Sequence, residues 1–266
     1  MSGRVQIFAG LGFKNLLLAV AGLAGLYAIF ALAWWGGKSD LHYAARDGDR
    51  KVAARLLSAG AAANGRDAYG WTPLHVAAYE GQEEVALTLL AAGADPDLRS
   101  KDGWVPLFLA IDNQNAGVAK LLVEAGAALS VTDPLARTPM VATSRLGQTE
   151  VVRALLARGR AVNQRRPPNN LTPLAAAAEH GHIATARLLL NHGADIEDPR
   201  NREHTILSFA ASQGRLNVVR LLLTAGADRG AKGIAGKLAI AVAREQGHDA
   251  IVELLATWRP RPNNDD

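Results

Sequence analysis

Histidine pairs and glycine-rich stretches are the residues of this chain whose types and spacing could do chemistry. His180 and His182 flank Gly181, and two nearby histidines can bind a metal ion when carboxylates or cysteines complete the ligand set. The chain has no cysteine, and no carboxylate set accompanies the histidine pair. We therefore predict no metal site, and disulfides, thiolate zinc sites and cysteine nucleophiles are excluded.

Two glycine-rich stretches superficially suggest nucleotide binding. From Gly230 to Lys237 there are five residues between the glycines where a phosphate-binding loop has four. Leu238 stands where a serine or threonine would bind magnesium. Residues 10–12 read Gly-Leu-Gly and lack the third glycine of a dinucleotide fingerprint. Neither stretch predicts a nucleotide site.

Paired acids and triad-like residues also have a structural explanation. Glu83 and Glu84 begin a predicted helix, where acidic side chains complement the helix dipole. No order of Ser, His and Asp stands out as a catalytic triad. We therefore predict that the chain is not an enzyme and that it has no catalytic residues, no cofactor and no small-molecule substrate.

Most of these histidines, acids and glycines lie within one recurring sequence unit. Its clearest copy spans residues 67–97 and includes Thr72-Pro73-Leu74-His75. A glycine seven residues after the leucine appears in every copy except the third, which has Gln114. A fixed period of this size predicts stacked helix-turn-helix units. At gaps of 33 or 34 residues, the position of Leu74 recurs as Leu41, Leu107, Met140, Leu174, Leu207 and Ile240.

The physics of the unit follows from its residue types. Thr72 can cap a helix by accepting a hydrogen bond from the free amides of the first turn, and Pro73 suits the first helical position. Gly81 and Gly93 can end the two helices in the left-handed conformation. Both helices are too short to be stable alone, so each repeat must bury its apolar face on the next. We expect Leu189 to lie in that inter-repeat core.

The period, the Thr-Pro-Leu-His stretch and the repeated glycines closely resemble ankyrin repeats over roughly residues 40–258. The resemblance implies an all-α solenoid of about seven helix-turn-helix repeats joined by β-turn fingers. It also implies structural roles for His42 and His75. The third repeat departs from the pattern, because Val105 and Phe108 replace Thr and His. The first and seventh repeats are expected to be end caps.

A long apolar run precedes the repeats. Residues 16–35 are twenty residues without a charge, which is enough to cross a hydrocarbon core of about 30 Å. We therefore predict that a single transmembrane helix, acting as a signal anchor, precedes the solenoid. Arg4 and Lys14 lie before it, and the positive-inside rule then keeps the N-terminus in the cytoplasm. Residues 31–33 read Ala-Leu-Ala and leave a cleaved signal peptide open.

The predicted organisation has five parts. A short basic segment covers residues 1–15, the transmembrane helix 16–35 and a linker 36–40. The repeat domain covers 41–258, and a polar, proline-broken tail predicted to be disordered covers 259–266. This order makes a single-pass membrane protein that contacts the membrane through residues 16–35. Its repeats would lie outside the cytoplasm, which in a bacterium means an inner-membrane protein facing the periplasm.

The resemblance implies that a protein partner binds the fingers and the concave face of the first helices. Trp71 and Trp104 occupy equivalent finger positions, and we expect them to centre an aromatic patch with Tyr69 and Tyr79. In the alternative, each indole packs against the helices of its own repeat. The candidate partner-binding residues are Tyr69, Trp71, Tyr79, Glu80, Lys101, Trp104, Asp112, Arg137, Arg145 and Arg202.

The charge balance narrows the partners further. The chain has 29 basic and 25 acidic residues with mixed signs, so no nucleic-acid partner is predicted. The leading hypothesis is a membrane-anchored adaptor that binds a protein on the exported side, with an inhibitor or immunity protein as its sharper form. The alternatives are a structural accessory subunit of a membrane complex and a regulator or maturation factor of a periplasmic enzyme.

Overall fold

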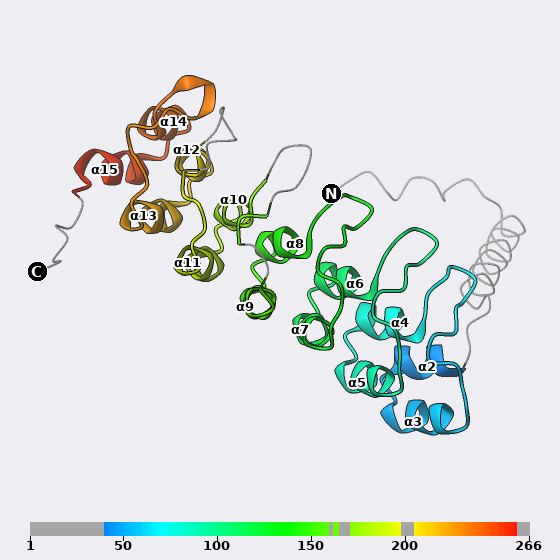
Figure 1. Cartoon of the computed structure of the whole chain (residues 1–266). Helices are drawn as coiled ribbons and strands as arrows, with labels where there is room; N and C mark the ends of the chain where they lie inside the picture. The colour runs from blue at the N-terminus through cyan, green and yellow to red at the C-terminus, as the bar shows by residue number, and fades with distance from the viewer. Residues whose placement is uncertain (1–39, 160–161, 165–170, 198–204, 260–266) are drawn as a thin grey trace, which may run out of the picture.

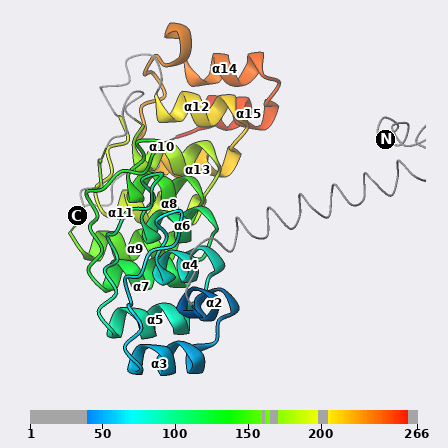
Figure 2. The ribbon, with the colours of Figure 1, turned by 90° about the vertical axis from the view of Figure 1, so that its right-hand side faces the viewer.

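A computed structural model describes residues 40–159, 162–164, 171–197 and 205–259 of the chain. These residues form paired α-helices that stack side by side in a single array (Figure 1). The first helices of the pairs make one row and the second helices make another. In the turned view of Figure 2, the helices lie across the array, with α2 and α3 at one end and α14 at the other.

The fingers are the turn segments that precede the first-row helices, such as residues 67–71 and 100–104. The first row contains the helix that follows each finger. Its members are α2 (Asp40–Asp47), α4 (Pro73–Glu80), α6 (Pro106–Asp112), α8 (Pro139–Arg145), α10 (Pro173–Glu179), α12 (Ile206–Ser212) and α14 (Ala239–Glu245). The second row contains α3 (Arg50–Ser58), α5 (Glu83–Ala91), α7 (Ala116–Glu124), α9 (Thr149–Ala157), α11 (Ile183–Asn191), α13 (Leu216–Thr224) and α15 (Asp249–Thr257). The predicted all-α solenoid of about seven repeats is confirmed in the described residues.

Helix starts follow the predicted capping chemistry. The side chain of Thr72 accepts from the backbone N–H of His75, and Pro73 is the first residue of α4. The hydroxyl of Thr138 caps α8 in the same way. Val105 cannot do so, and α6 has no side-chain cap at its start. The departure seen in the third repeat therefore removes a hydrogen bond but keeps the helix.

The core lies between the two rows and runs along the whole array. The side chains at the Leu74 position are almost wholly buried from the first repeat to the sixth. A second buried stripe comes from the second-row helices and includes Leu89, Leu122, Leu155 and Leu189. Leu189 is fully buried, so its predicted place in the inter-repeat core is confirmed.

Polar side chains join each repeat to the one before it. The residue after the turn glycine or its equivalent donates to a carbonyl near the end of the preceding first-row helix, which would otherwise lack an intrahelical partner. Gln82 Nε2 donates to the carbonyl of Arg46 at 3.1 Å, and Asn115 Nδ2 donates to that of Ala78 at 3.0 Å. Similar bonds are made by Gln148, His182, Arg215 and His248.

The predicted transmembrane helix has to be corrected. No helix among the described residues is long and apolar enough to cross a membrane. The described α-helices have seven to nine residues, which is roughly 10–14 Å of length against about 30 Å of hydrocarbon. Residues 16–35, on which the prediction rested, lie outside the described residues, as do 1–15, 36–39 and 260–266. The fold is therefore described as an all-α solenoid alone.

The turn between the paired helices requires a left-handed residue. Glycine supplies it in most repeats, as at Gly81 with a φ of 78°. Gln114 occupies this position in the third repeat and adopts a φ of 60°. A side chain in this conformation costs roughly 1–2 kcal/mol. The break in the glycine pattern is therefore a strained turn and leaves the helix pair intact.

We expect Gln114→Gly to stabilise the protein by about 1 kcal/mol, because glycine removes the left-handed strain. Chemical denaturation of the full chain measures the change. Gln213→Gly is the matched control, since Gln213 caps the C-terminus of α12 with a φ of −89°, and the protein should lose stability on this substitution. Equal effects of the two substitutions would show that the φ of Gln114 carries no strain.

Leu189→Ala should destabilise the protein by about 2–5 kcal/mol, because it removes buried methyl groups and leaves a cavity. Leu87→Ala is its control, since Leu87 is 52% exposed on α5 and should change stability by less than about 0.5 kcal/mol. The free energy of unfolding is measured for both variants. Similar losses for the two would contradict the assigned core.

Candidate protein-binding surface

In the second and third repeats, one polar side chain holds the finger at its base. Asp67 Oδ1 accepts from the backbone N–H groups of Tyr69 at 2.9 Å and Trp71 at 2.8 Å. Ser100 occupies the same position one repeat later, and its Oγ accepts from the backbone N–H of Trp104 at 3.1 Å. Asp67 and Ser100 also donate their own N–H groups to the carbonyls of Trp71 and Trp104, both at 2.8 Å. These bonds hold the backbone of the second and third fingers in one conformation.

Neighbouring fingers are also joined to each other. The backbone N–H of Lys101 donates to the carbonyl of Tyr69 at 3.0 Å. One guanidinium nitrogen of Arg66 donates to the carbonyls of Gly70 at 3.2 Å and Arg99 at 2.6 Å. Gly70 allows the close approach, because a Cβ there would lie 2.9 Å from the nitrogen of Lys101. The second and third fingers therefore present one continuous surface.

His75 connects the second repeat to the third finger. Its Nε2 lies 3.1 Å from the carbonyl of Trp104, and its Nδ1 accepts from the backbone N–H of Thr72 at 3.1 Å. The ring therefore carries its proton on Nε2. Burial of the imidazole lowers the pKa of His75 to about 4. His42 makes the equivalent bond to the carbonyl of Trp71 at 3.0 Å, so the expected structural roles of both histidines fit the geometry.

The exposed part of the aromatic patch consists of tyrosines. Tyr69 is 43% exposed and Tyr79 is 41% exposed. Trp71 is half-buried against the hydrophobic core, and its ring centroid lies 5.5 Å from that of Tyr79. Trp104 also packs against the core, and in the described part of the chain no ring contact joins the two indoles. The indoles thus support the fingers, while the tyrosines face the solvent.

Arg137 occupies the tryptophan position in the fourth repeat but is buried. Its guanidinium forms ion pairs with Asp133, at the base of its own finger, and with Asp112, at the end of α6. Asp133 also accepts from the backbone N–H of Arg137 at 2.7 Å, as Asp67 does for Trp71. Arg137 therefore serves to fix this finger and offers little surface to a partner.

A polar region adjoins this ion pair. Asp112 Oδ1, Ser144 Oγ, Arg145 Nε and Gln148 Oε1 are buried atoms without a hydrogen-bond partner within the described protein. They come from the end of α6, from the end of α8 and from the residue before α9. Among the sequence-predicted residues, Asp112 and Arg145 thus bring one unused acceptor and one unused donor to adjacent repeats.

The remaining predicted residues lie on the same side of the array or outside the described chain. Glu80 is exposed at the end of α4, and Lys101 is exposed in the third finger. Arg202 lies outside the described residues. Sequence reasoning missed Leu135, which is 57% exposed and occupies the position of Tyr69 two repeats later. Adding twice the repeat period to Tyr69 would have identified it.

The histidine pair considered for metal binding has another role. His182 Nε2 bonds to the carbonyl of Arg145 at 3.0 Å, and the rings of His180 and His182 stack with centroids 6.2 Å apart. Within the residues that the structure describes, no group of three or more His, Cys, Asp or Glu side chains could hold a metal ion. His182 is thus explained by the inter-repeat bonds.

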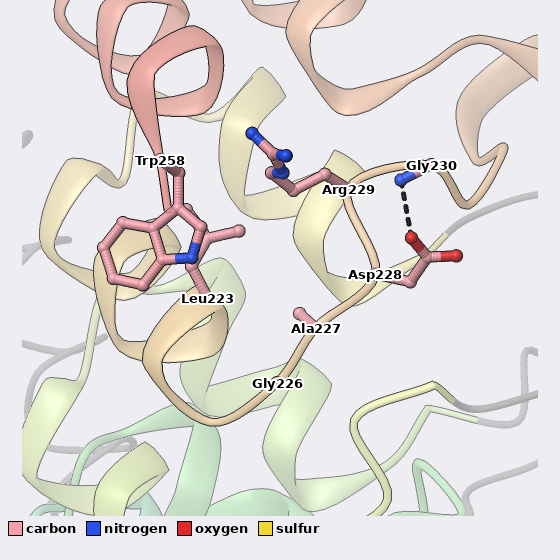
Figure 3. A pocket seen from close by; sticks show the side chains of 7 residues that line it. All are labelled: Leu223, Gly226, Ala227, Asp228, Arg229, Gly230 and Trp258. Carbon is pink, nitrogen blue, oxygen red and sulfur yellow. Dashed lines mark hydrogen bonds between the residues drawn. The ribbon is translucent and has the colours of Figure 1, made fainter. Parts of the chain in front are cut away.

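A separate pocket of about 450 Å³ lies near the C-terminal end of the array (Figure 3). Trp258 and Leu223 line one part of it, and the loop from Gly226 to Gly230 lines the rest. Its one cation, Arg229, already donates to the carbonyl of Leu255 at 3.0 Å. Asp228 accepts from the backbone N–H of Gly230 at 2.7 Å. These polar groups hold the loop from Gly226 to Gly230 in place. Because the pocket lies near the C-terminal end of the array, it is not part of the finger surface of the second to fourth repeats.

Comparisons with known proteins agree with this architecture. A family model described as ankyrin repeats (3 copies) matches residues 23–100, 41–133, 89–166, 107–200 and 140–233. The crystal structure of the ankyrin repeat domain of human ASB11 is similar, with a TM-score of 0.70, 27% identity, and coverage of 84% of this chain and 100% of that one. The ankyrin repeat domain of Bcl-3, described as a unique member of the IkappaB protein family, has a TM-score of 0.68, 25% identity, and coverage of 82% and 99%. No curated protein sequence matches this chain.

We expect the stability of the protein to fall as the pH drops from 6.5 towards 4. The unfolded chain binds a proton at His75 below about pH 6.5, whereas the folded chain resists protonation down to about pH 4. The free energy of unfolding therefore carries no penalty from His75 above pH 6.5, and it is about 3 kcal/mol lower by pH 4.

Denaturation curves across this range measure how the free energy of unfolding changes with pH. His75→Gln should reduce this pH dependence by the uptake of one proton on unfolding. Leu189→Ala is the control, because it lowers stability without removing a titratable group and should keep the slope. An unchanged slope in His75→Gln would contradict the buried, neutral state of the ring.

Proposed function

Because this chain belongs to the ankyrin-repeat family, we propose that it binds a protein partner through the fingers and first-row helices of its second to fourth repeats. The fold is that of a protein-interaction scaffold, typically without enzymatic activity, and it is suited to protein–protein contact. The proposed location of the binding site is supported by the exposure of Tyr69 and Tyr79 on a finger surface whose backbone is already held by hydrogen bonds.

The aromatic part of this surface supplies contact area. Tyrosine side chains offer large amphipathic surfaces at a low cost in side-chain entropy, and aromatic residues are enriched at interfaces. Tyr79 rests on the ring of Trp71, and the finger of Tyr69 is bonded to Asp67 and Lys101. Little flexibility therefore has to be lost when a partner binds, which favours affinity.

The polar part of the surface supplies selectivity. Arg145 Nε and Asp112 Oδ1 are a donor and an acceptor without a protein partner in the described residues. Both atoms are buried, so a partner meets these two residues only through the partly exposed remainder of their side chains, whose opposite charges favour a partner with complementary charges. Glu80 and Lys101 add exposed charges of opposite sign at the edge. The expected partner therefore combines an apolar centre with complementary charges.

Two finer hypotheses from the sequence concern the setting in which this surface acts. A location of the repeats outside the cytoplasm rests on Arg4 and Lys14, which lie outside the described residues. A role as an inhibitor or immunity protein is likewise a hypothesis about the same finger surface. Both concern where the scaffold acts and on which protein, and neither alters the docking surface proposed above.

The double substitution Tyr69→Ala with Tyr79→Ala should weaken capture of the partner at least thirtyfold, because truncation of central aromatic residues commonly costs 2 kcal/mol or more. The partner is first identified by cross-linking to the wild-type chain, and its affinity for each variant is then measured. The free energy of unfolding should change little, since both side chains are exposed.

Leu87→Ala is the matched control. Leu87 is another exposed large apolar side chain, but it belongs to α5 in the second row. Its truncation should leave the affinity unchanged. Normal binding by the folded double tyrosine variant would move the partner site away from the second-repeat finger.

A further inference from the structure

The second row carries a line of basic side chains at one repeat position. Four consecutive helices of this row contribute one residue each, and all four residues are exposed. Because the helices stack side by side (Figure 1), equivalent positions form a line along the array. The four residues are Lys120 on α7, Arg153 on α9, Arg187 on α11 and Arg220 on α13.

The first two cations are paired within their own helices. Lys120 Nζ lies 3.8 Å from Glu124 Oε1, and Arg153 Nε lies 3.3 Å from Glu150 Oε2. These acids compensate the positive charge locally, although exposed pairs of this kind contribute little to stability. This half of the line is therefore electrically balanced.

The last two cations lack such acids. The positions equivalent to Glu150 are Ala184 and Asn217 in the next two repeats, and those equivalent to Glu124 are Asn191 and Thr224. No ion pair involves Arg187 or Arg220 among the described residues. The two helices α11 and α13 thus present guanidinium groups, and neither helix contains a carboxylate of its own.

These two arginines line a common groove. It lies between α11 and α13 and has a volume of about 280 Å³. Leu221 is buried and Ile183 is half-buried, so the groove has an apolar floor. The exposed Asn217 adds a neutral carboxamide to the lining. The lining residues are Ile183, Arg187, Asn217, Arg220, Leu221 and Thr224.

We propose that this groove binds an acidic peptide segment of a second protein, with one carboxylate on Arg187 and another on Arg220. A guanidinium matches a carboxylate in a bidentate geometry, which a free arginine can satisfy and a paired one cannot. The apolar floor takes a hydrophobic side chain of the same segment. This surface belongs to the second row, so it is separate from the finger surface assigned to the main partner.

The spacing of the two arginines indicates the form of the peptide. Packed helices lie about 8–10 Å apart, so equivalent residues on α11 and α13 are separated by about that distance. A polyproline II segment rises about 3.1 Å per residue with three residues per turn. Carboxylates three residues apart then lie on one face, about 9 Å from each other, and match the two guanidinium groups.

A broad anionic surface fits this row less well than a short peptide. Exposed acids lie on the second-row helices on either side of the groove and would repel a membrane surface or a nucleic acid backbone. A discrete segment can lie between them without meeting them. These acids are Glu83, Glu84, Glu124, Glu150, Asp249 and Glu253.

The test uses the full chain and a fluorescent peptide that carries glutamate at every third position, with proline and leucine between. Fluorescence anisotropy at low ionic strength should show binding to the wild type and none of the peptide in which glutamine replaces glutamate. Arg187→Gln with Arg220→Gln should weaken binding at least tenfold. Arg153→Gln is the matched control and should leave it unchanged, because Arg153 is already paired.

A second variant tests the same idea without removing an arginine. Ala184→Glu with Asn217→Glu recreates the arrangement of Glu150 and Arg153 in both repeats, so the new acids should occupy the arginines and weaken binding to a similar degree. Equal binding of the glutamate and glutamine peptides, or normal binding by both double variants, would overturn the proposal.

Two further arms distinguish other anions. A peptide with phosphoserine in place of glutamate that binds when the glutamate peptide does not would overturn the carboxylate assignment in favour of a phosphorylated segment. Binding to phosphatidylserine vesicles that depends on Arg187 and Arg220, without binding to the glutamate peptide, would overturn it in favour of a membrane surface. Binding of the glutamate peptide that is lost in both double variants supports the proposal.

Discussion

Every helix pair of this molecule depends on burying its leucine stripe against the next pair. Helices of seven to nine residues are marginal alone, since nucleation costs more than so few hydrogen bonds return. Leu74 and Leu89 remove that difficulty by burial against neighbouring repeats, and the bonds from Gln82 and Asn115 fix the register between repeats. The stability of the array is therefore the sum of the interactions between neighbouring repeats, and residues at surface positions can vary without unfolding it.

That freedom separates the two faces of the array. On the finger side, each turn is built from bonds of its own backbone, such as those at Asp67, and the turn then carries whichever side chain the repeat supplies. On the second row, the helix supplies the framework, and exposed positions such as Arg187 and Arg220 need no role in folding. One scaffold can thus present an aromatic surface and a cationic groove without a conflict between them.

The period of the sequence predicted the helix pairs, the buried leucines and the caps, because these features repeat wherever the same packing repeats. It could not predict the environment of Trp71, Trp104 and Arg137, which share one position. In the fourth repeat, Arg137 is buried and forms ion pairs with Asp112 and Asp133, and Asp112 comes from another repeat. The hydropathy of residues 16–35 predicted a membrane span, but the fold that the structure describes rests entirely on short helices packed against one another.

Function in such an array has to lie where the repeats differ, because residues shared by all repeats are occupied by stacking. Tyr69 and Leu135 occupy one finger position with different apolar side chains, while Asp112 and Arg145 occupy another with opposite charges. In the second row, the change from Glu150 to Asn217 frees an arginine that its counterpart keeps paired. A departure from the period that costs the fold nothing, as at Asn217, is therefore a better indicator of binding than one that strains it, as at Gln114.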